Sequence, residues 1–419
     1  MFIIILTAAV YTVCAFSAAR ARGRLMPQSG NGVIAAIFLA AAAARTAAAL
    51  LYPGYATDMQ CFSAWADIAY KDGLYSFYTN GIFSDYPPGY IYVLYIIGFI
   101  KSIFNPGTEV FYFLLKTPAM LCDFLCALVI MKTARKNRSL AAVCAALFLF
   151  NPAVIVNSAV WGQVDSVFTF FVLLTIYCIY TERLYPAYFL FAAAVFIKPQ
   201  ALFYTPVVAY AFFEQVFAGE FSAHKMFRHI FAGLSAILMM VLLALPFNIS
   251  AVISQYRETL GSYNYASVNA YNLWTALGLN WHEPNVIINA AGYLFIVLTV
   301  IYSAVLYFSG RRRNRCFFVS SFICFAVFML SVKMHDRYAY PAIPLMLCAY
   351  AVSEDIGELI LYLGITFFQF VNAAHVLFYY TPETYYSTPF GKTAVIISIA
   401  AAVFFAAACI YAERTKHHE

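Results

Sequence analysis

Long apolar runs recur from one end of the chain to the other, and they limit its fold more than any other feature. Residues 2–18, 139–158 and 285–308, for example, contain no charged side chain. Runs of roughly 20 residues are typical of helices that cross the hydrocarbon core of a bilayer. A soluble domain with 64% hydrophobic and 11% charged residues would expose far too much apolar surface. The sequence therefore predicts an all-α, polytopic transmembrane helical bundle.

We predict about 13 spans, namely residues 2–18, 33–52, 109–131, 139–158, 164–181, 185–197, 199–213, 230–247, 285–308, 316–332, 338–352, 357–378 and 392–412. No basic residue precedes the first run, so we interpret it as an uncleaved span with its N-terminus outside rather than as a signal peptide. A break is expected at Lys198-Pro199, because proline removes a helical hydrogen bond.

Basic residues gather in short loops, as they do on the cytoplasmic side of membrane proteins. These loops are residues 20–24, 132–138, 224–229, 311–315 and 414–418. All five face the same side only if one of the neighbouring stretches 88–104 and 109–131 does not cross the membrane. We assign 88–104, which follows two prolines, to the interface or to a re-entrant segment. The loop at residues 52–90 then lies outside.

The net charge of +6 comes largely from these loops, so a nucleic-acid partner is not expected. The ten cysteines lie mostly inside the spans, which is typical of small core residues rather than of disulfides or metal ligands. The chain contains no dinucleotide, Walker, zinc-protease or serine-hydrolase motif. We therefore expect no cofactor, although the scattered external acids could bind a divalent metal weakly.

The first external loop carries four carboxylates: Asp58, Asp67, Asp72 and Asp85. The run TDMQ at residues 57–60 fits a capping box, which predicts a helix from Thr57 to about Tyr70. Phe62, Trp65 and Ala69 would share one face of this juxtamembrane amphipathic helix with Asp58. The helix N-terminus favours an ionised carboxylate, so Asp58 is the predicted general base. The alternative is that Asp58 merely favours the helix start.

Two further motifs place polar side chains beside apolar runs. SDYPPGY at residues 84–90 is stiffened by its prolines and would hold Asp85 and Tyr86 in place, unless it is an ordinary turn. WGQVD at residues 161–165 would offer Trp161, Gln163 and Asp165 to a sugar or to the base, unless these residues only cap a helix.

Cations on the external side are the most informative signal. Lys198, Lys333, His335 and Arg337 fall where basic residues are under-represented. A lipid phosphate would supply the anion they need. The alternative is pairing with the protein's own acids, among them Asp165 and Asp336.

The loop at residues 248–284 combines amides with aromatic rings, for example Asn272 and Trp274. Such a mixture suits carbohydrate by hydrogen bonding and stacking. It equally suits an ordinary interfacial loop.

At these residues the chain resembles the membrane-embedded glycosyltransferases of the GT-C superfamily. It is most similar to bacterial homologues of the glycosylphosphatidylinositol mannosyltransferases and to the ER glucosyltransferases that use dolichyl-phosphate-glucose. The resemblance lies in an ordered set between about residues 50 and 345: Asp58 before Trp65, DYPP at 85–88, NP at 151–152, WGQVD at 161–165, KPQALFY at 198–204, NAYNLW at 269–274 and HDRY at 335–338. WGQVD is the bacterial form, so the donor sugar does not follow from the resemblance.

This resemblance implies a single GT-C-type domain over residues 1–419, with an extra span and basic loop at 1–32, a catalytic region at 33–345 and C-terminal spans at 346–419. It implies transfer of a hexose from a polyprenyl- or dolichyl-phosphate sugar, with inversion, on the extracytoplasmic face of a membrane. Asp58 would be the base. The donor phosphate would lie near Lys198, Gln200 and residues 335–337, with Tyr338 beside it.

The acceptor would be a glycan or glycolipid of the cell envelope, and the bacterial plasma membrane is the expected location. A membrane transporter or flippase for a lipid-linked saccharide is the alternative function. Such transporters usually contain internal repeats, and none is evident in this sequence.

Overall fold

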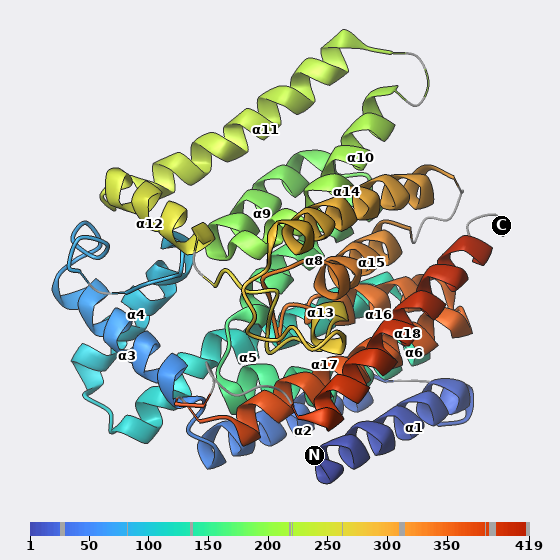
Figure 1. Cartoon of the computed structure of the whole chain (residues 1–419), viewed down its shortest axis with the longest axis horizontal. Helices are drawn as coiled ribbons and strands as arrows, with labels where there is room; N and C mark the ends of the chain where they lie inside the picture. The colour runs from blue at the N-terminus through green and yellow to red at the C-terminus, as the bar shows by residue number, and fades with distance from the viewer. Residues whose placement is uncertain are drawn as a thin grey trace. The chain divides into compact units, whose positions relative to one another are not determined.

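The computed structural model describes residues 1–25, 30–81, 83–134, 137–217, 219, 221–261, 263–309, 315–381, 383–384 and 391–415. These residues are almost entirely helical (Figure 1). The first half contains α1 (Phe2–Leu25), α2 (Asn31–Leu51), α3 (Ala56–Lys71), α4 (Pro88–Phe104), α5 (Thr108–Thr133), α6 (Arg138–Leu149), α7 (Pro152–Ile155), α8 (Asp165–Tyr180), α9 (Leu184–Ile197) and α10 (Thr205–Phe217). The second half contains α11 (Ala223–Ala244), α12 (Ile249–Gly261), α13 (Leu273–Ala276), α14 (Val286–Phe308), α15 (Arg315–Leu330), α16 (Ala342–Ser353), α17 (Ile356–Tyr379) and α18 (Lys392–Thr415).

The helices group into two compact units. The first unit comprises Met1–Ala44, Phe124–Asn157 and Tyr263–Glu419, and the second comprises Arg45–Asp123 and Ser158–Ser262. The predicted division of the chain at residues 32 and 345 stays a prediction.

Seven described helices are long and apolar enough to cross a membrane: α1, α2, α5, α11, α14, α17 and α18. Helix α6, together with α7 and the π-helical turn Val156–Trp161, bends by 47° and is at most an eighth span. Helices α4, α8, α9, α15 and α16 are apolar but have only 12 to 17 residues. At 1.5 Å per residue they reach about 18–26 Å, less than the core thickness of about 30 Å. The chain is therefore a multi-pass membrane protein, and the predicted count of about 13 spans is not confirmed.

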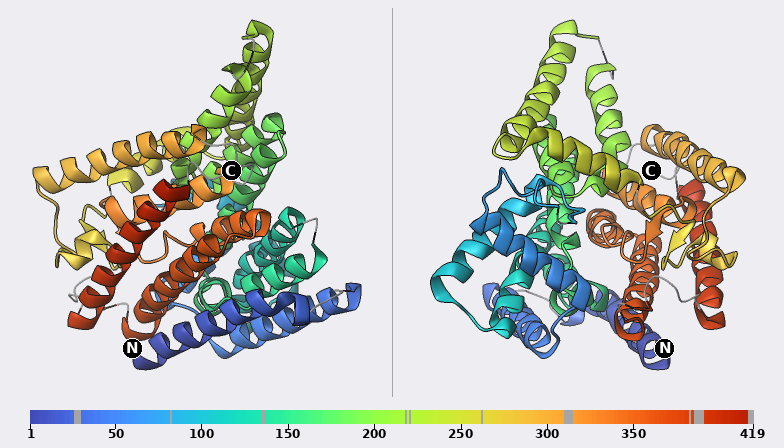
Figure 2. Two further views of the ribbon diagram at one scale, coloured as in Figure 1. Left: turned by 90° about the vertical axis from the view of Figure 1, so that its right-hand side faces the viewer. Right: turned by 60° about the vertical axis from the view of Figure 1, so that its left-hand side comes forward.

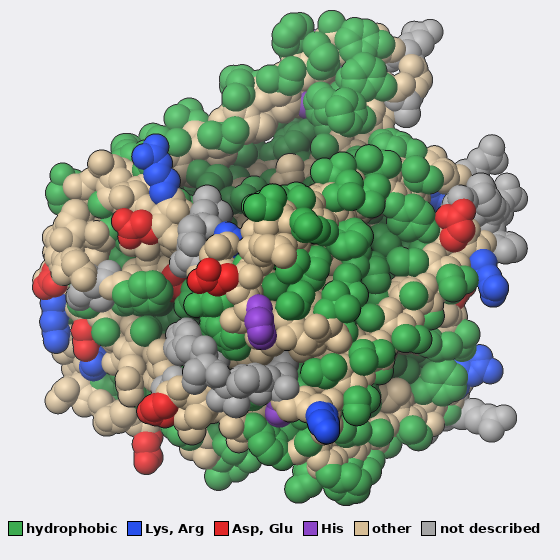
Figure 3. All heavy atoms as spheres, in the orientation of Figure 1, with side chains coloured by type: hydrophobic (Ala, Val, Ile, Leu, Met, Phe, Trp, Pro, Cys, Tyr) green, Lys and Arg blue, Asp and Glu red, His purple; other side chains and the backbone are tan. Residues whose placement is uncertain are grey.

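The exposed faces of the long helices are apolar, as helices in lipid require. On α11, Phe231 is 72% exposed and Leu234 is 60% exposed, and on α14 Val286 is 84% exposed. Figure 3 shows hydrophobic side chains covering α11, and Figure 2 shows α11 next to α10 within the second unit. Exposure on this scale would make a soluble protein aggregate, and in a membrane it is the lipid contact.

Several segments expected to be loops are helical. Residues 20–24 belong to the end of α1, and residues 224–229 form the first turns of α11, whose N-cap is Ser222. The side chain of Ser222 accepts a hydrogen bond from the Lys225 backbone N–H, and this contact fixes the earlier start. Parts of the other basic loops, residues 135–136, 311–314 and 416–418, lie outside the described residues.

The region at residues 248–284 was expected to be an irregular loop, but it contains α12, α13 and a strand. Strand β1 (Ser267–Val268) pairs in parallel with β2 (Met334–His335), with Ser267 opposite Met334. The all-α prediction is therefore correct for the bundle but omits this two-residue pairing. The break at Lys198 is confirmed, because α9 ends at Ile197 and a 3₁₀ turn over Pro199–Tyr204 precedes α10.

Candidate active site

Helix α3 presents Asp58 in its first turn, as predicted. The predicted capping box is wrong, because Tyr55 occupies the N-cap position and no side chain caps the helix. Tertiary packing accounts for this start: the ring of Tyr55 lies 5.7 Å from that of Trp161, and its backbone N–H donates to the Trp161 carbonyl. Asp58 still lies among the free N–H groups of the first turn, where negative charge is stabilised.

Beyond Asp58, the same side of α3 is an apolar face at helical spacing. Met59, Phe62, Trp65, Ala66 and Ala69 are buried, so the predicted face is confirmed. The Trp65 ring lies 5.7 Å from that of Tyr86, and its indole N–H donates to the Phe83 carbonyl at 2.8 Å. These contacts show Trp65 and Tyr86 packing α3 against the start of α4.

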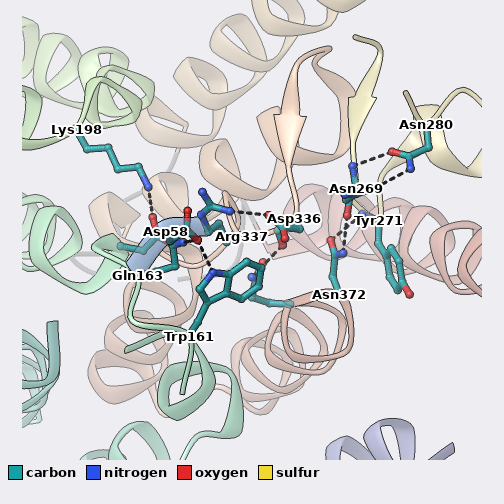
Figure 4. Close-up of polar contacts among 12 residues, drawn as sticks. Asp58, Trp161, Gln163, Lys198, Asn269, Tyr271, Asn280, Asp336, Arg337 and Asn372 are labelled. Atoms are coloured by element: carbon teal, nitrogen blue, oxygen red, sulfur yellow. Dashed lines mark hydrogen bonds and ion pairs between the residues drawn. The ribbon is translucent and has the colours of Figure 1, made fainter. Parts of the chain in front are cut away.

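The carboxylate of Asp58 is held by two donors from residues 161–165 (Figure 4). Trp161 Nε1 donates to Asp58 Oδ2 at 2.7 Å, and Gln163 Nε2 donates to the same oxygen. Trp161 is fully buried and Gln163 is 1% exposed, whereas Asp58 is half-buried. No hydrogen bond to Asp58 Oδ1 is found within the described part of the chain. Oδ2 is thus held by two donors.

The bend between the two donors requires glycine. Gly162 has φ +90°, which L side chains rarely adopt, and a Cβ there would lie 2.7 Å from Met59 Sδ. The chain can therefore turn closely over α3 and bring both donors to Asp58.

The pKa of the Cys61 thiol, one turn after Asp58, depends on the charges near it. Burial raises the pKa of Cys61 to about 11, and the negative charges of Asp58 and Asp85 add to this effect. Cys61 therefore stays protonated at neutral pH. Both carboxylates lie close enough to act on it, so Asp85 belongs to the surroundings of Asp58.

Lys198 and Asp165 form an ion pair, at 5% and 1% exposure. Asp165 is the first residue of α8, and Lys198 ends α9. The ammonium also lies 5.4 Å from the centre of the Phe168 ring. The alternative given above for the external cations, pairing with the protein's own acids, is therefore observed here.

The amide oxygens Gln163 Oε1 and Gln200 Oε1 are among the buried side-chain atoms that have no hydrogen-bond partner within the described residues. An unsatisfied buried acceptor is costly. Either oxygen could accept a hydrogen bond from a sugar hydroxyl.

Charged residues inside predicted spans were missed by the sequence analysis. Arg45 and Asp123 form a fully buried pair, with Arg45 Nε 3.0 Å from Asp123 Oδ2. Lys116 is fully buried and donates to the carbonyl oxygens of Ala49 and Tyr52 at the end of α2. The signal was present, because an ionisable residue in an apolar span is usually functional or paired.

In the first unit, Asn272 and Trp274 are bound within the protein. Asn272 caps α13 by accepting from the Thr275 N–H at 3.1 Å, and it donates to the Phe328 carbonyl. Trp274 Nε1 donates to the Leu330 carbonyl at 3.1 Å. Both side chains tie the loop to the end of α15. This matches the alternative given above, an ordinary interfacial loop.

The HDRY motif begins at the last residue of β2 in the same unit. The His335 ring lies 4.8 Å from that of Tyr263 and 4.9 Å from that of Tyr338. Arg337 lies 3.2 Å from the fully buried carboxylate of Asp336. This second cation therefore also has an acid of the protein beside it.

No group of three or more histidine, cysteine, aspartate or glutamate side chains suited to hold a metal occurs among the residues that the structure describes.

Residues 82–214 match the model of a family described as alpha-(1->6)-mannopyranosyltransferase, N-terminal domain. The match spans about a third of the chain and includes Asp85, WGQVD and Lys198, while Asp58 lies outside it. No curated protein matches the chain. The similarity is to mannosyltransferases of GT-C type, and it supports a glycosyltransferase.

Proposed function

We propose that the protein is an inverting glycosyltransferase that moves a hexose from a polyprenyl-phosphate-linked sugar to a lipid-linked or cell-envelope acceptor on the extracytoplasmic face. The observation that carries this proposal is the carboxylate of Asp58, fixed through Oδ2 by Trp161 and Gln163. The family match favours mannose as the sugar.

Asp58 would act as the general base. The acceptor hydroxyl gives its proton to Asp58 Oδ1 while its oxygen bonds to the anomeric carbon of the donor. The bond from that carbon to the phosphate oxygen breaks on the opposite face, so the configuration inverts. Fixed donors on Oδ2 keep the other oxygen aimed at the hydroxyl, which is the geometric requirement for base catalysis.

The leaving group is a polyprenyl phosphate, whose negative charge grows as the bond breaks. A cation in a low-dielectric site stabilises such charge well. Lys198 is buried and paired with Asp165. We assign phosphate binding to Lys198, and the predicted role of His335 and Arg337 stays a prediction.

A transporter or flippase for a lipid-linked saccharide remains the second candidate. The buried pairs Arg45–Asp123 and Lys198–Asp165 favour it, because transport pathways often contain such pairs. The two functions differ in whether a new glycosidic bond forms.

Purified protein incubated with labelled polyprenyl-phosphate-mannose and a glycolipid extract tests the proposal. Asp58→Asn should lower transfer by about 10²- to 10⁴-fold, the usual contribution of a general base, and leave donor binding intact. Asp67→Asn is the matched control, because Asp67 lies on the same helix but pairs with Lys101 on its surface. Unchanged transfer by Asp58→Asn would remove the base assignment. Movement of the labelled lipid without transfer would favour the flippase.

A further inference from the structure

One buried carboxylate holds both ends of the segment that contains the donors to Asp58. Asp123, on α5, accepts a hydrogen bond from Ser158 Oγ on Oδ2 and one from Ser166 Oγ on Oδ1, each at 2.6 Å. Asp123 and both serines are fully buried. Residues 158–166 lie between these two anchors.

The segment between the anchors is irregular. It contains the end of a π-helical turn, a glycine with φ +90° and the first residues of α8. Residues 162–164, between the π-helical turn and α8, have no repeating helical hydrogen bonds to fix their path. The anchors at Ser158 and Ser166 hold the two ends of the segment and so contribute to the positions of Trp161 and Gln163.

We infer that Asp123 is a positioning residue for Asp58, acting through residues 158–166. It does not touch the proposed reacting atoms. Its two oxygens each fix one serine, and the fixed segment brings Trp161 and Gln163 to Asp58. This inference rests on the proposed function for its catalytic consequence only.

A purely structural explanation is available and makes a different prediction. Arg45 Nε lies 3.0 Å from Asp123 Oδ2, so Asp123 could serve only to neutralise Arg45 inside the membrane. In that case the two serines would be dispensable. The serine hydroxyls are therefore the groups to remove, because their loss leaves the Arg45–Asp123 pair in place.

The test uses the double variant Ser158→Ala/Ser166→Ala in the full chain. Its matched control is Ser320→Ala/Ser398→Ala, which also removes two fully buried hydroxyls. Each of the control hydroxyls donates to the carbonyl four residues earlier in its own helix. The control therefore measures the cost of losing two buried hydroxyls without the loss of hydrogen bonds to a buried carboxylate.

The first readout is the ¹⁹F NMR spectrum of protein labelled with fluorotryptophan. The chain has four tryptophans, so single Trp→Phe variants assign every signal. The Trp161 signal should shift in the double serine variant, because its indole loses its fixed position against Asp58. The signals of Trp274 and Trp281 should not shift, and the control should leave all four in place.

The second readout is steady-state kinetics with polyprenyl-phosphate-mannose. We expect kcat to fall at least tenfold while KM for the donor stays within about twofold. The reason is that the segment positions the base and does not bind the donor in its ground state. An unshifted Trp161 signal would overturn the inference whatever the activity. A loss of thermal stability with kcat and the Trp161 signal unchanged would also overturn it and assign Asp123 to Arg45 alone. A shifted Trp161 signal in a protein whose wild type transfers no sugar would support the positioning and refute the proposed function.

Discussion

Replacement of Gly54 by alanine would test whether the turn before α3 and the backbone at Trp161 hold each other in place. Gly54 has φ +100°, and a Cβ there would lie 2.6 Å from Met59 Cγ and 2.8 Å from the Trp161 carbonyl oxygen. Ordinary van der Waals contact begins at 3.4 Å, so the backbone at Trp161 has to move by about 0.6 Å or more. The Met59 side chain can bend away, but the carbonyl moves only with its chain.

The energetic cost has two parts. An alanine in the left-handed region costs roughly 1–2 kcal/mol, and forcing extra volume into packed structure costs typically about 1–3 kcal/mol more. Gly73 supplies the control, because it has φ +82° just after α3 and nothing lies within 4 Å of its Cβ position. Gly73→Ala should therefore show the backbone strain alone. Gly54→Ala should be less stable than this control by about 1–3 kcal/mol.

The displacement also bears on the base. Trp161 Nε1 lies 2.7 Å from Asp58 Oδ2, and a shift of the Trp161 backbone lengthens this bond. Misplacement of a catalytic group by about 1 Å can cost about 10²-fold in rate. We therefore expect Gly54→Ala to lose about 10- to 100-fold in sugar transfer and Gly73→Ala to stay within about twofold.

The loss of stability is measured by thermal unfolding in detergent, with tryptophan fluorescence as the signal. The loss of activity is measured by transfer of labelled mannose. The reasoning predicts that both losses are larger for Gly54→Ala than for Gly73→Ala. Equal stability and equal activity of the two variants would show that the contact between Gly54 and Trp161 constrains nothing.

Two further predictions concern charge in the second unit. Lys198→Met and Asp165→Asn should each destabilise the protein by about 3–5 kcal/mol, since either change leaves a buried charge without its partner. The double variant should lose less stability than the sum of the two single losses. A double-mutant cycle in thermal unfolding measures this difference. The pKa of Cys61 is raised to about 11, so alkylation of this thiol should be slow at neutral pH and rise as pH approaches 11. Asp85→Asn removes a negative charge that raises this pKa, and it should therefore lower the pKa and speed alkylation at pH 9. An unchanged alkylation rate in Asp85→Asn would show that the two groups do not interact.

Local features of α3 could be predicted because local patterns determine them. The spacing of Phe62, Trp65 and Ala69 predicted a buried face, and the structure confirms it. The proline after Lys198 likewise predicted the end of α9. The start of α3 was wrong by about two residues, because packing of Tyr55 on Trp161 decides it and the capping pattern does not.

The contacts of Asp58 could not be derived in the same way. Trp161 and Gln163 are more than 100 residues away in sequence, and only the fold brings them together. The sequence indicated which side chains are unusual for an apolar region but not how they pair. The Arg45–Asp123 pair could have been proposed from the sequence, since each residue interrupts an apolar run and each needs an opposite charge.

Charge balance around residues 158–166 gives a separate reason to choose Asp58 as the base. Three carboxylates belong to or contact this segment, and two of them have a cation: Asp123 has Arg45, and Asp165 has Lys198. If either of these took up a proton, its buried cation would lose its partner, which is costly in a low-dielectric interior. Asp58 is held by the neutral side chains of tryptophan and glutamine, so accepting a proton leaves no buried cation without its partner. Of the three acids, Asp58 is therefore the one that we propose as the base.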